Sequence, residues 1–491
     1  MICSAAPDGT STEGIISALR DYDAHDAVGL AELVARGEVS PTELLEAAIA
    51  RMEERNPKLN AVVIPLLDEA HAAIARGLPS GPLRGVPFLL KDLGAHYAGA
   101  RMSSGSRLFE DFVSDRDSEL TARYKRAGLV VFGRSASPEL GLTTTTESIL
   151  FGKTRNPWNL ERTTGGSSGG AAAAVAGGIV PCAHASDGGG SIRIPASCCG
   201  LFGLKPTRAR IPLGPHMGEN WSGMSTVHAV TRSVRDSAAL LDASHGAALG
   251  DPYWAPPPER PYSDEVGRPP GRLRIALQTQ TFTGADTHPD CVTAAADAAK
   301  LCADLGHEVA EAALTIDRAQ LARATGPIIG ASILSLLEDR AQALGRPFGE
   351  GDVEPLTYLM AKRAESAGAA AYARAIRGLH AVGRVVAAFF ERYDVLLTPT
   401  LAVPPLPLGG PLALTHSDPE EHAAALLRTI GFTQLFNAAG NPAMSVPLFW
   451  NGDGLPIGAQ FAGRFGDEAT LLRLAAQLEE ARPWSERRPA F

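Results

Sequence analysis

The spacing of apolar residues near the start of the chain predicts a well-defined helix. It begins at Ser40-Pro41-Thr42-Glu43, where Ser40 can cap the first turn, Pro41 suits that turn and Glu43 can reach back to the cap. One apolar face then follows at helical spacing, formed by Leu44, Leu45, Ala48, Ile49 and Met52.

Short apolar runs that follow such helices predict strands. They lie at residues 86–90, 129–132, 273–277 and 395–398. The first run ends on Lys91-Asp92, and the second follows a helical pattern at 120–125 and is closed by Gly133. A long stretch, 364–390, is helical by composition. Helices that alternate with strands favour an α/β fold with a mostly parallel sheet.

A proline-rich segment, residues 251–271, interrupts this alternation. It predicts a surface connection, and it is the best candidate for a domain boundary. Its prolines are Pro252, Pro256, Pro257, Pro258, Pro261, Pro269 and Pro270. A length of 491 residues would by itself suggest about three domains at roughly 150 residues each.

Composition and charge narrow the class of protein. A hydrophobic fraction of 45% with 20% charged residues is typical of a globular chain, and a net charge of −9 without blocks of like charge argues against a nucleic-acid partner. Six cysteines without zinc-ligand spacing predict no metal site and favour reduced thiols in the cytosol. The first residues lack the pattern of a secretory signal. The longest uncharged stretch, 163–186, contains Pro181, His184 and many Gly and Ser residues, so we expect no membrane span.

Glycine is concentrated in one segment that also carries two serines. Nine glycines lie between positions 165 and 190, in the sequence GGSSGGAAAAVAGGIVPCAHASDGGGS. Glycine permits positive φ and close approach to a ligand, so two such turns can aim hydroxyl and backbone N–H groups at one reacting group. A flexible linker is the alternative, but residues 171–176 predict a helix and 192–195 an ordered strand end.

Two familiar motifs match this segment only in part. A phosphate-binding loop needs Lys and then Ser or Thr after Gly170, where Ala171 and Ala172 stand. Residues 165–169 satisfy G-x-S-x-G, but a hydrolase elbow follows an apolar strand, and polar residues 161–164 precede this one. The histidine of such a triad would be one of several candidates without distinguishing context, such as His216, His228 and His245.

The remaining hypothesis is that a serine of the glycine-rich segment is the nucleophile and that its base is not a histidine. A lysine can act as the base if burial lowers its pKa towards neutrality. Lys91 is the candidate, because it ends an apolar strand that would carry it inward, although most lysines are solvated.

These segments together resemble the amidase signature family. GGSSGG followed by DGGGS places Ser191 24 residues after Ser167, and residues 85–92 (GVPFLLKD) resemble the family's lysine segment. Similarity extends to NPWN at 156–159, GLFGLKP at 200–206, 231–236, 397–400 and 454–461. The resemblance covers about residues 25–485.

The resemblance implies one domain, residues 1–491, with an α/β/α body and a central mixed, mostly parallel sheet covered by helices. It divides into an N-terminal helical segment (about 25–75), the signature core (about 76–245), the connection 251–271 and a C-terminal part (272–491).

The resemblance also implies the roles of the site residues. Ser191 is the nucleophile, Ser167 the bridging serine after a cis peptide from Gly166, and Lys91 the base. Backbone N–H groups of Gly188, Gly189, Gly190 and Ser191 form the oxyanion hole, and Asp187 pairs with Arg193 to support the loop.

One position departs from the family pattern. The family usually has Thr where this chain has Gly188. Backbone donation survives the change, so we expect a more mobile loop or extra room for a bulky acyl group.

The expected substrate is a neutral, fairly apolar linear or cyclic amide, with carbamates and aryl esters as further candidates. The most similar members are monofunctional bacterial amidases that resemble nylon-oligomer cyclic dimer hydrolase and carbamate-cleaving enzymes. Pocket candidates are Asn220, Trp221 and Thr325.

No cofactor, nucleic acid or membrane is expected, and a homodimer is an open alternative to a monomer. Two other functions stay open, a glutaminase subunit of a tRNA-dependent amidotransferase and a non-catalytic interaction protein on the same fold.

Overall fold

The computed structural model describes residues 22–491. The first residues, for which the sequence predicts no secretory signal, lie outside this range. The α-helices, in chain order, are α2 (Ala27–Ala35), α3 (Pro41–Leu59), α4 (Leu67–Ala75), α5 (Glu119–Arg126), α6 (Gly169–Ala176), α7 (Arg193–Cys199), α8 (Val234–Ser244), α9 (Pro289–Asp304), α10 (Arg318–Leu344), α11 (Pro355–Glu365), α12 (Ala369–Phe389), α13 (Pro419–Thr429), α14 (Gln434–Ala439) and α15 (Glu468–Ala481). The strands are β1 (Val62–Pro65), β2 (Pro87–Lys91), β3 (Val130–Ser135), β4 (Glu147–Ser148), β5 (Gly152–Lys153), β6 (Arg155–Asn156), β7 (Asn159–Thr163), β8 (Cys182–Asp187), β9 (Phe202–Lys205), β10 (Thr226–Thr231), β11 (Arg274–Leu277), β12 (Glu308–Glu311), β13 (Val395–Pro399), β14 (Ala443–Trp450) and β15 (Pro456–Gly463).

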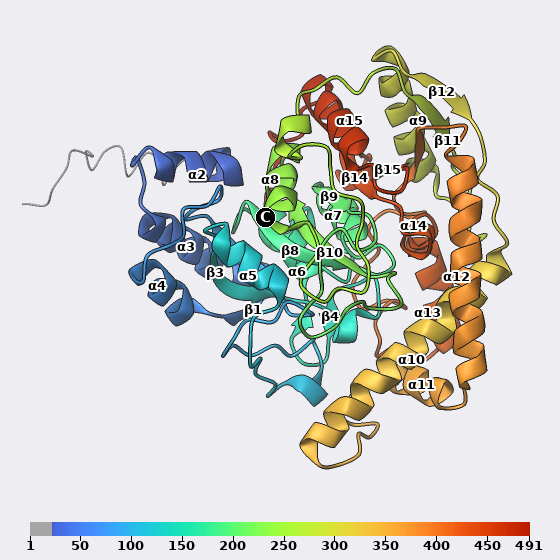
Figure 1. The fold of residues 1–491 in the computed structure, drawn as a ribbon, viewed down its shortest axis with the longest axis horizontal. Helices are drawn as coiled ribbons and strands as arrows, with labels where there is room; N and C mark the ends of the chain where they lie inside the picture. The colour runs from blue at the N-terminus through green and yellow to red at the C-terminus, as the bar shows by residue number, and fades with distance from the viewer. Residues whose placement is uncertain (1–21) are drawn as a thin grey trace, which may run out of the picture.

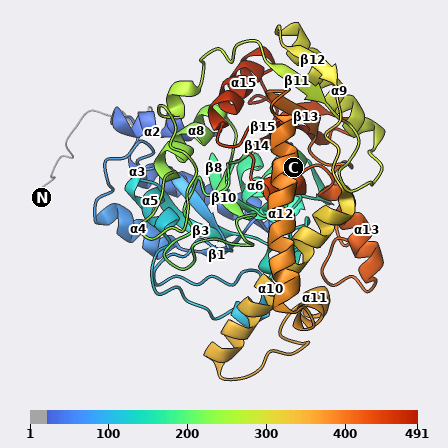
Figure 2. The same cartoon turned by 45° about the vertical axis from the view of Figure 1, so that its right-hand side comes forward.

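Helices surround a central sheet whose strands come from both halves of the chain. Its eleven strands follow the order β1-β3-β2-β8-β10-β9-β14-β15-β13-β11-β12. Helices α2 to α4 lie at one end of the molecule and α9 lies beside β11 and β12 at the other, while α10 and α12 run along the right-hand side (Figure 1). In Figure 2, α12 comes to the front and crosses α10, with which it packs.

The sheet is mixed, but the prediction that it is mostly parallel is wrong. Antiparallel neighbours outnumber parallel ones by six pairs to four. Parallel strands need a crossover connection, whereas antiparallel strands can be joined by a short turn. Strands β14 and β15 are joined in that way, through residues 451–455. Antiparallel pairs also occur in the first half of the chain, between β1 and β3 and between β10 and its neighbours β8 and β9, so the alternation of helices and strands does not fix strand direction.

Local sequence signals are confirmed at several places. Ser40 Oγ accepts from the Glu43 backbone N–H at 3.2 Å, and a Glu43 carboxylate oxygen accepts from the Ser40 N–H at 2.8 Å, so the capping box forms. Strands β2, β11 and β13 lie where apolar runs predict them. Segment 251–271 runs over the surface and is fastened to α8, where Asp242 accepts from the backbone N–H groups of Tyr262 at 2.6 Å and Ser263 at 2.8 Å.

Three predicted boundaries are wrong. Strand β3 does not end at Gly133 but continues to Ser135, because Gly133 pairs with β1 and with β2 at an irregular register. The helical stretch 364–390 contains a break at residues 366–368, between α11 and α12. Residues 192–195, expected as a strand end, instead lead into α7, which begins at Arg193.

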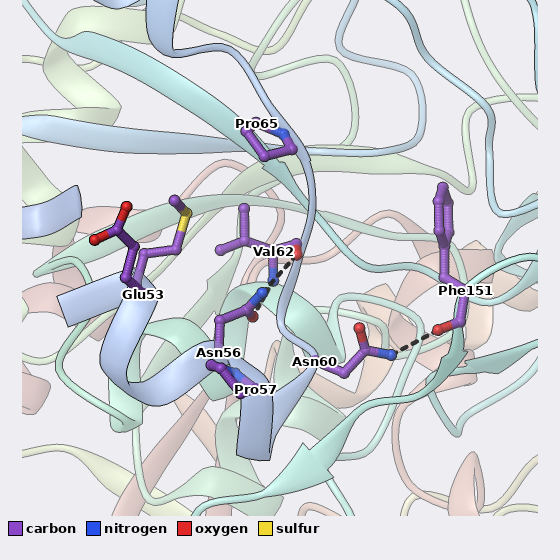
Figure 3. A pocket seen from close by; sticks show the side chains of 8 residues that line it. Glu53, Asn56, Pro57, Asn60, Val62, Pro65 and Phe151 are labelled. Atoms are coloured by element: carbon purple, nitrogen blue, oxygen red, sulfur yellow. Dashed lines mark hydrogen bonds between the residues drawn. The ribbon is translucent and has the colours of Figure 1, made fainter. Parts of the chain in front are cut away.

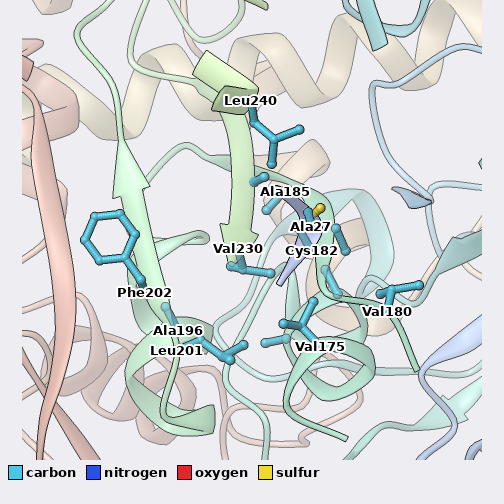
Figure 4. Packing of buried hydrophobic residues seen from close by; sticks show 14 of the residues in the cluster. Ala27, Val175, Val180, Cys182, Ala185, Ala196, Leu201, Phe202, Val230 and Leu240 are labelled. Atoms are coloured by element: carbon cyan, nitrogen blue, oxygen red, sulfur yellow. The ribbon is translucent and has the colours of Figure 1, made fainter. Parts of the chain in front are cut away.

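The uncharged stretch 163–186 becomes the centre of the core. All residues of α6 are buried, and β8, which follows it, lies inside the sheet. Figure 4 shows the packing there, with Val175 of α6 near Cys182 of β8, Val230 of β10 and Leu201. Burying apolar surface of this kind contributes about 25 cal/mol per Å². Across residues 22–491, each helix is too short or too polar to cross a membrane.

Candidate active site

Lys91 is the last residue of β2 and is completely buried. Its Nζ lies 2.7 Å from Ser167 Oγ and 3.0 Å from Ser186 Oγ, and its backbone N–H donates to His184 Nδ1 at 3.2 Å. Burial lowers the pKa of Lys91 to about 7, and the Asp187 carboxylate opposes only part of this decrease. A substantial fraction of the amine is therefore neutral near pH 7 and able to accept a proton.

Ser167 lies in the turn that leads into α6, directly beside Lys91. The Gly166–Ser167 peptide is cis, as the resemblance implies. The Ser167 side chain is almost fully buried. Glycine is needed before it, because a Cβ on Gly166 would lie 2.7 Å from the Thr145 carbonyl oxygen. The backbone on both sides of this serine is thus tightly packed.

Ser191 lies at the other end of the site, between β8 and α7. Its carbonyl accepts from the Ser168 N–H at 3.3 Å, so the two serine turns are in contact. Its side chain is the most exposed of the three, at 9%. Among the hydrogen bonds of residues 22–491, the one that Ser167 Oγ forms is to Lys91 Nζ, and the Ser191-to-Ser167 bond expected for a relay is not formed in this conformation.

An ion pair behind the Ser191 loop holds it in place. Asp187 and Arg193 are both fully buried, and Arg193 donates from Nε to one Asp187 oxygen at 2.9 Å and from Nη2 to the other at 2.8 Å. Burial alone would raise the pKa of Asp187, but the Arg193 guanidinium lowers it to about 2. The Ile192 N–H also donates to Asp187, at 3.1 Å, which fixes the start of α7.

The last third of the chain supplies further partners of this ion pair. Arg193 donates to Asn437 Oδ1, to Gln460 Oε1 at 2.8 Å and to the Thr433 carbonyl at 2.9 Å. Asn437 Nδ2 in turn donates to the Asp187 carboxylate at 2.8 Å. Sequence analysis missed these residues, because they lie at least 240 positions from Arg193 and carry no local motif. Ser186, which contacts Lys91, could have been found from the sequence, because it directly precedes Asp187 at the start of the second serine turn.

The three glycines before Ser191 have different surroundings. Gly190 has a φ of +137°, and a Cβ on it would lie 2.5 Å from Thr433 Oγ1. A Cβ on Gly189 would meet nothing within 4 Å, while Thr433 Oγ1 donates to the Gly189 carbonyl at 2.6 Å. The N–H groups of this loop are the predicted oxyanion donors.

The expected extra room beside Gly188 is absent. A Cβ on Gly188 would lie 2.6 Å from Trp221 Cζ3, so the indole ring already occupies the space in which a Thr side chain would begin. The absence of a side chain at this position therefore accommodates Trp221 rather than a larger acyl group.

The other pocket candidates are placed differently. The Asn220 carbonyl closes the turn that carries Trp221, accepting from the Gly223 N–H at 3.1 Å. Thr325 is buried in α10, where its hydroxyl donates to the Leu321 carbonyl at 3.1 Å. The hydroxyl of Thr325 is thus used inside its own helix, and no contact of it with the serines or Lys91 is formed in the described residues.

A separate hollow of about 450 Å³ lies between α3, β1 and Phe151. In Figure 3, Asn56 bonds with Val62 and Asn60 with Phe151 at its wall. None of the candidate site residues lines it. Among residues 22–491, no three His, Cys, Asp or Glu side chains gather closely enough to hold a metal ion.

Comparisons with known proteins agree with the fold. The family profile described as Amidase matches residues 43–472. The "6-aminohexanoate-cyclic-dimer hydrolase" of Pseudomonas sp. (strain NK87) is 42% identical over 477 residues, 94% of this chain and 96% of that protein. The structure of "6-aminohexanoate cyclic dimer hydrolase complexed with substrate" superposes with a TM-score of 0.91 at 40% identity, covering 96% of this chain and 99% of the other. A bacterial aryl acylamidase structure superposes with a TM-score of 0.87 at 29% identity, covering 94% and 97%.

Within this helix-covered mixed sheet a buried lysine contacts a serine hydroxyl, an arrangement in which the lysine can act as a base towards the hydroxyl. Similarity of this extent to amide-cleaving proteins makes the chain an amide-hydrolysing enzyme. It belongs to the amidase family, in the amidase signature group.

Proposed function

We propose that this enzyme hydrolyses neutral, fairly apolar amides through an acyl-enzyme formed on Ser191. The observation that carries the proposal is the contact of 2.7 Å between Lys91 Nζ and Ser167 Oγ in a fully buried setting. A buried lysine with a pKa of about 7 is a suitable general base at neutral pH.

Acylation begins when Lys91 accepts the Ser167 proton while Ser167 accepts the proton of Ser191. This requires the Ser191 hydroxyl to turn towards Ser167 when substrate binds, and catalytic hydrogen bonds often tighten only at that stage. Ser191 Oγ then forms a bond to the amide carbon, and the carbonyl oxygen becomes an oxyanion that accepts from the N–H groups of residues 188–191.

The C–N bond breaks when the same relay runs in reverse. Lys91 returns its proton through Ser167 to the leaving nitrogen, which departs as a neutral amine. Water then attacks the ester on Ser191, loses a proton to the relay and releases the carboxylic acid. Ser191 recovers its proton, so the enzyme is restored without a net change.

The substrate range follows from this chemistry and from the relatives. The cyclic dimer of 6-aminohexanoate, a neutral cyclic amide, is a candidate, because two relatives at 42% and 41% identity are named for hydrolysing it, and neutral linear amides are further candidates. Carbamates and aryl esters present the same carbonyl to Ser191 and are further candidates. We expect the substrate to be a small neutral molecule and the enzyme to act in the cytosol, without a nucleic-acid or membrane partner. A homodimer stays an open alternative to a monomer.

Incubating the purified chain with p-nitroacetanilide, 6-aminohexanoate cyclic dimer, a phenyl carbamate and glutamine tests the proposal. We expect amine release from the first two and an acyl adduct on Ser191 by mass spectrometry of quenched reactions. The Ser191→Ala variant, folded to the same melting temperature, should give neither. Ammonia from glutamine alone would instead indicate the glutaminase alternative. Absence of turnover and of any adduct would favour the non-catalytic one.

A further inference from the structure

We propose that Trp221 selects acyl groups that are unbranched at the carbon next to the carbonyl, and that Gly188 is the residue that admits its ring. This inference rests on the proposed acyl-enzyme at Ser191.

The indole ring lies against the backbone of the proposed oxyanion loop. A Cβ built on Gly188 would stand 2.6 Å from Trp221 Cζ3, 2.8 Å from Cε3 and 3.5 Å from Cη2. Two ring atoms, Cζ3 and Cε3, are thus too close to allow a Cβ at this position, and Cη2 lies at ordinary contact distance. Gly188 is three residues before Ser191, in the loop whose N–H groups would receive the carbonyl oxygen. The substituents nearest to the ring are therefore those on the carbon next to that carbonyl.

An unusual turn presents the ring. Trp221 and Ser222 both have a φ of +51°, and Gly223 has a φ of +77°. Three successive residues are thus left-handed, a conformation that costs a non-glycine residue about 1 kcal/mol or more and is found at functional sites. Backbone bonds close the turn, from the Met224 N–H to the Trp221 carbonyl at 3.1 Å and from the Ser225 N–H to the Asn220 carbonyl at 3.2 Å.

The turn and the Ser191 loop share their supports. Asn437 Nδ2 donates to the Met224 carbonyl at 3.1 Å, and to the Asp187 carbonyl at 2.9 Å. Arg208 donates from Nε to the Gly223 carbonyl at 2.9 Å and from Nη2 to the Ala438 carbonyl at 2.7 Å. The backbone of the turn and that of the loop are thus both fastened to α14, which fixes the position from which the ring extends.

On its other side the ring is held by apolar packing. The half-buried Trp221 packs against two apolar clusters, one containing Met224 and Phe436 and the other containing Leu140 and Leu142. A methylene group accepted or refused by an apolar pocket is worth about 10- to 200-fold in kcat/KM. A wall fixed on both sides should therefore reject α-branched acyl groups by at least about tenfold.

The test measures kcat/KM for three p-nitroanilides, those of butanoic, 2-methylpropanoic and 2,2-dimethylpropanoic acid. We expect wild type to prefer the butanoyl compound. Trp221→Ala should raise the ratio of 2-methylpropanoyl to butanoyl turnover by about tenfold. Trp221→Leu, which retains apolar packing, should raise it in the same direction and covers the case in which the alanine variant does not fold. Trp254→Ala, at an exposed tryptophan outside the site, is the matched control and should leave the ratio unchanged.

A compensation experiment tests the pairing with Gly188. Gly188→Ala should lower turnover of all three anilides, since its Cβ overlaps the ring. The double variant Gly188→Ala with Trp221→Ala should recover much of that loss. An unchanged acyl preference in a folded, active Trp221 variant, or the absence of recovery in the double variant, would overturn the inference. Folded wild type that releases no p-nitroaniline and forms no adduct on Ser191 would overturn the proposed function instead.

Discussion

The two glycine-rich serine turns have similar sequences and opposite surroundings. In the first turn, at 165–170, backbone packs directly against backbone. A Cβ on Gly170 would lie 2.6 Å from the Ala136 carbonyl oxygen, and the serine is buried beside its lysine. In the second turn, at 187–191, the close neighbours are side chains instead, Trp221 at Gly188 and Thr433 at Gly190, while Gly189 faces open space. In the mechanism that we propose, the first turn holds the proton relay and the second receives the substrate.

The largest expected effect on kcat comes from replacing each of the two serines by alanine. Ser191→Ala should lower kcat by about 10⁴-fold or more and abolish the covalent adduct, because the nucleophile is lost. Ser167→Ala should slow turnover strongly but still allow a fluorophosphonate to label Ser191. The measurement is kcat together with intact-protein mass after labelling. Labelling that disappears with Ser167→Ala and survives Ser191→Ala would reverse our assignment of the two turns.

The glycines should differ in their effect on stability. Gly170→Ala forces a Cβ into the backbone of residue 136, so we expect a loss of about 3 kcal/mol or more in the free energy of unfolding. Gly189→Ala meets no atom within 4 Å and should change it by less than about 1 kcal/mol. Urea denaturation followed by circular dichroism measures both. Equal losses would mean that the turns are packed alike.

The pH dependence should report on the lysine beside the first turn. Below a pH of about 7, Lys91 becomes protonated and cannot accept the Ser167 proton, so kcat/KM should fall about tenfold per pH unit. The contribution of Lys91 to the free energy of unfolding also increases as the pH rises. The folded pKa lies below the ordinary 10.5, so the cost of burying the charge is fully present below about 7 and disappears as the pH rises towards 10.5.

A second buried lysine makes a control necessary for that profile. Burial also lowers the pKa of Lys205 to about 7, with the Arg193 charge acting in the same direction. Its Nζ donates to the Pro206 carbonyl at 2.8 Å, and among the hydrogen bonds of residues 22–491 none joins it to Ser167 or Ser191. Lys205→Met should therefore retain the inflection of kcat/KM near pH 7. An inflection that moves or vanishes in this variant would assign the titration to Lys205.

The smallest expected effect concerns the support of the second turn. Thr433→Val removes the hydroxyl that donates to the Gly189 carbonyl, a bond worth about 1 kcal/mol, so kcat/KM should fall about fivefold. Thr433→Ser keeps the hydroxyl and should remain near wild type. A Val variant with unchanged kcat/KM would show that the loop is positioned without this bond.

Sequence analysis identified the parts of the site that depend on local patterns. Lys91 ends an apolar run and both serines lie in glycine turns, so the structure brings together residues that the sequence already singled out. Sequence analysis could not predict the surroundings of Gly188. The ring of Trp221 extends from a turn whose left-handed residues have no distinct sequence signal. Strand directions were missed in both halves of the chain, because the order of helices and strands does not show that β1 runs antiparallel to β3, or that a short turn joins β14 to β15.

The buried arginine behind the nucleophile has a consequence for the synthesis of the protein. Arg193 and its partner Gln460 are 267 positions apart, so both serines leave the ribosome long before the side chains that brace their loop. A growing chain that stops short of β15 carries the nucleophile without its complete frame. In the mechanism that we propose, competence to cleave amides therefore cannot arise before Gln460 has been synthesised.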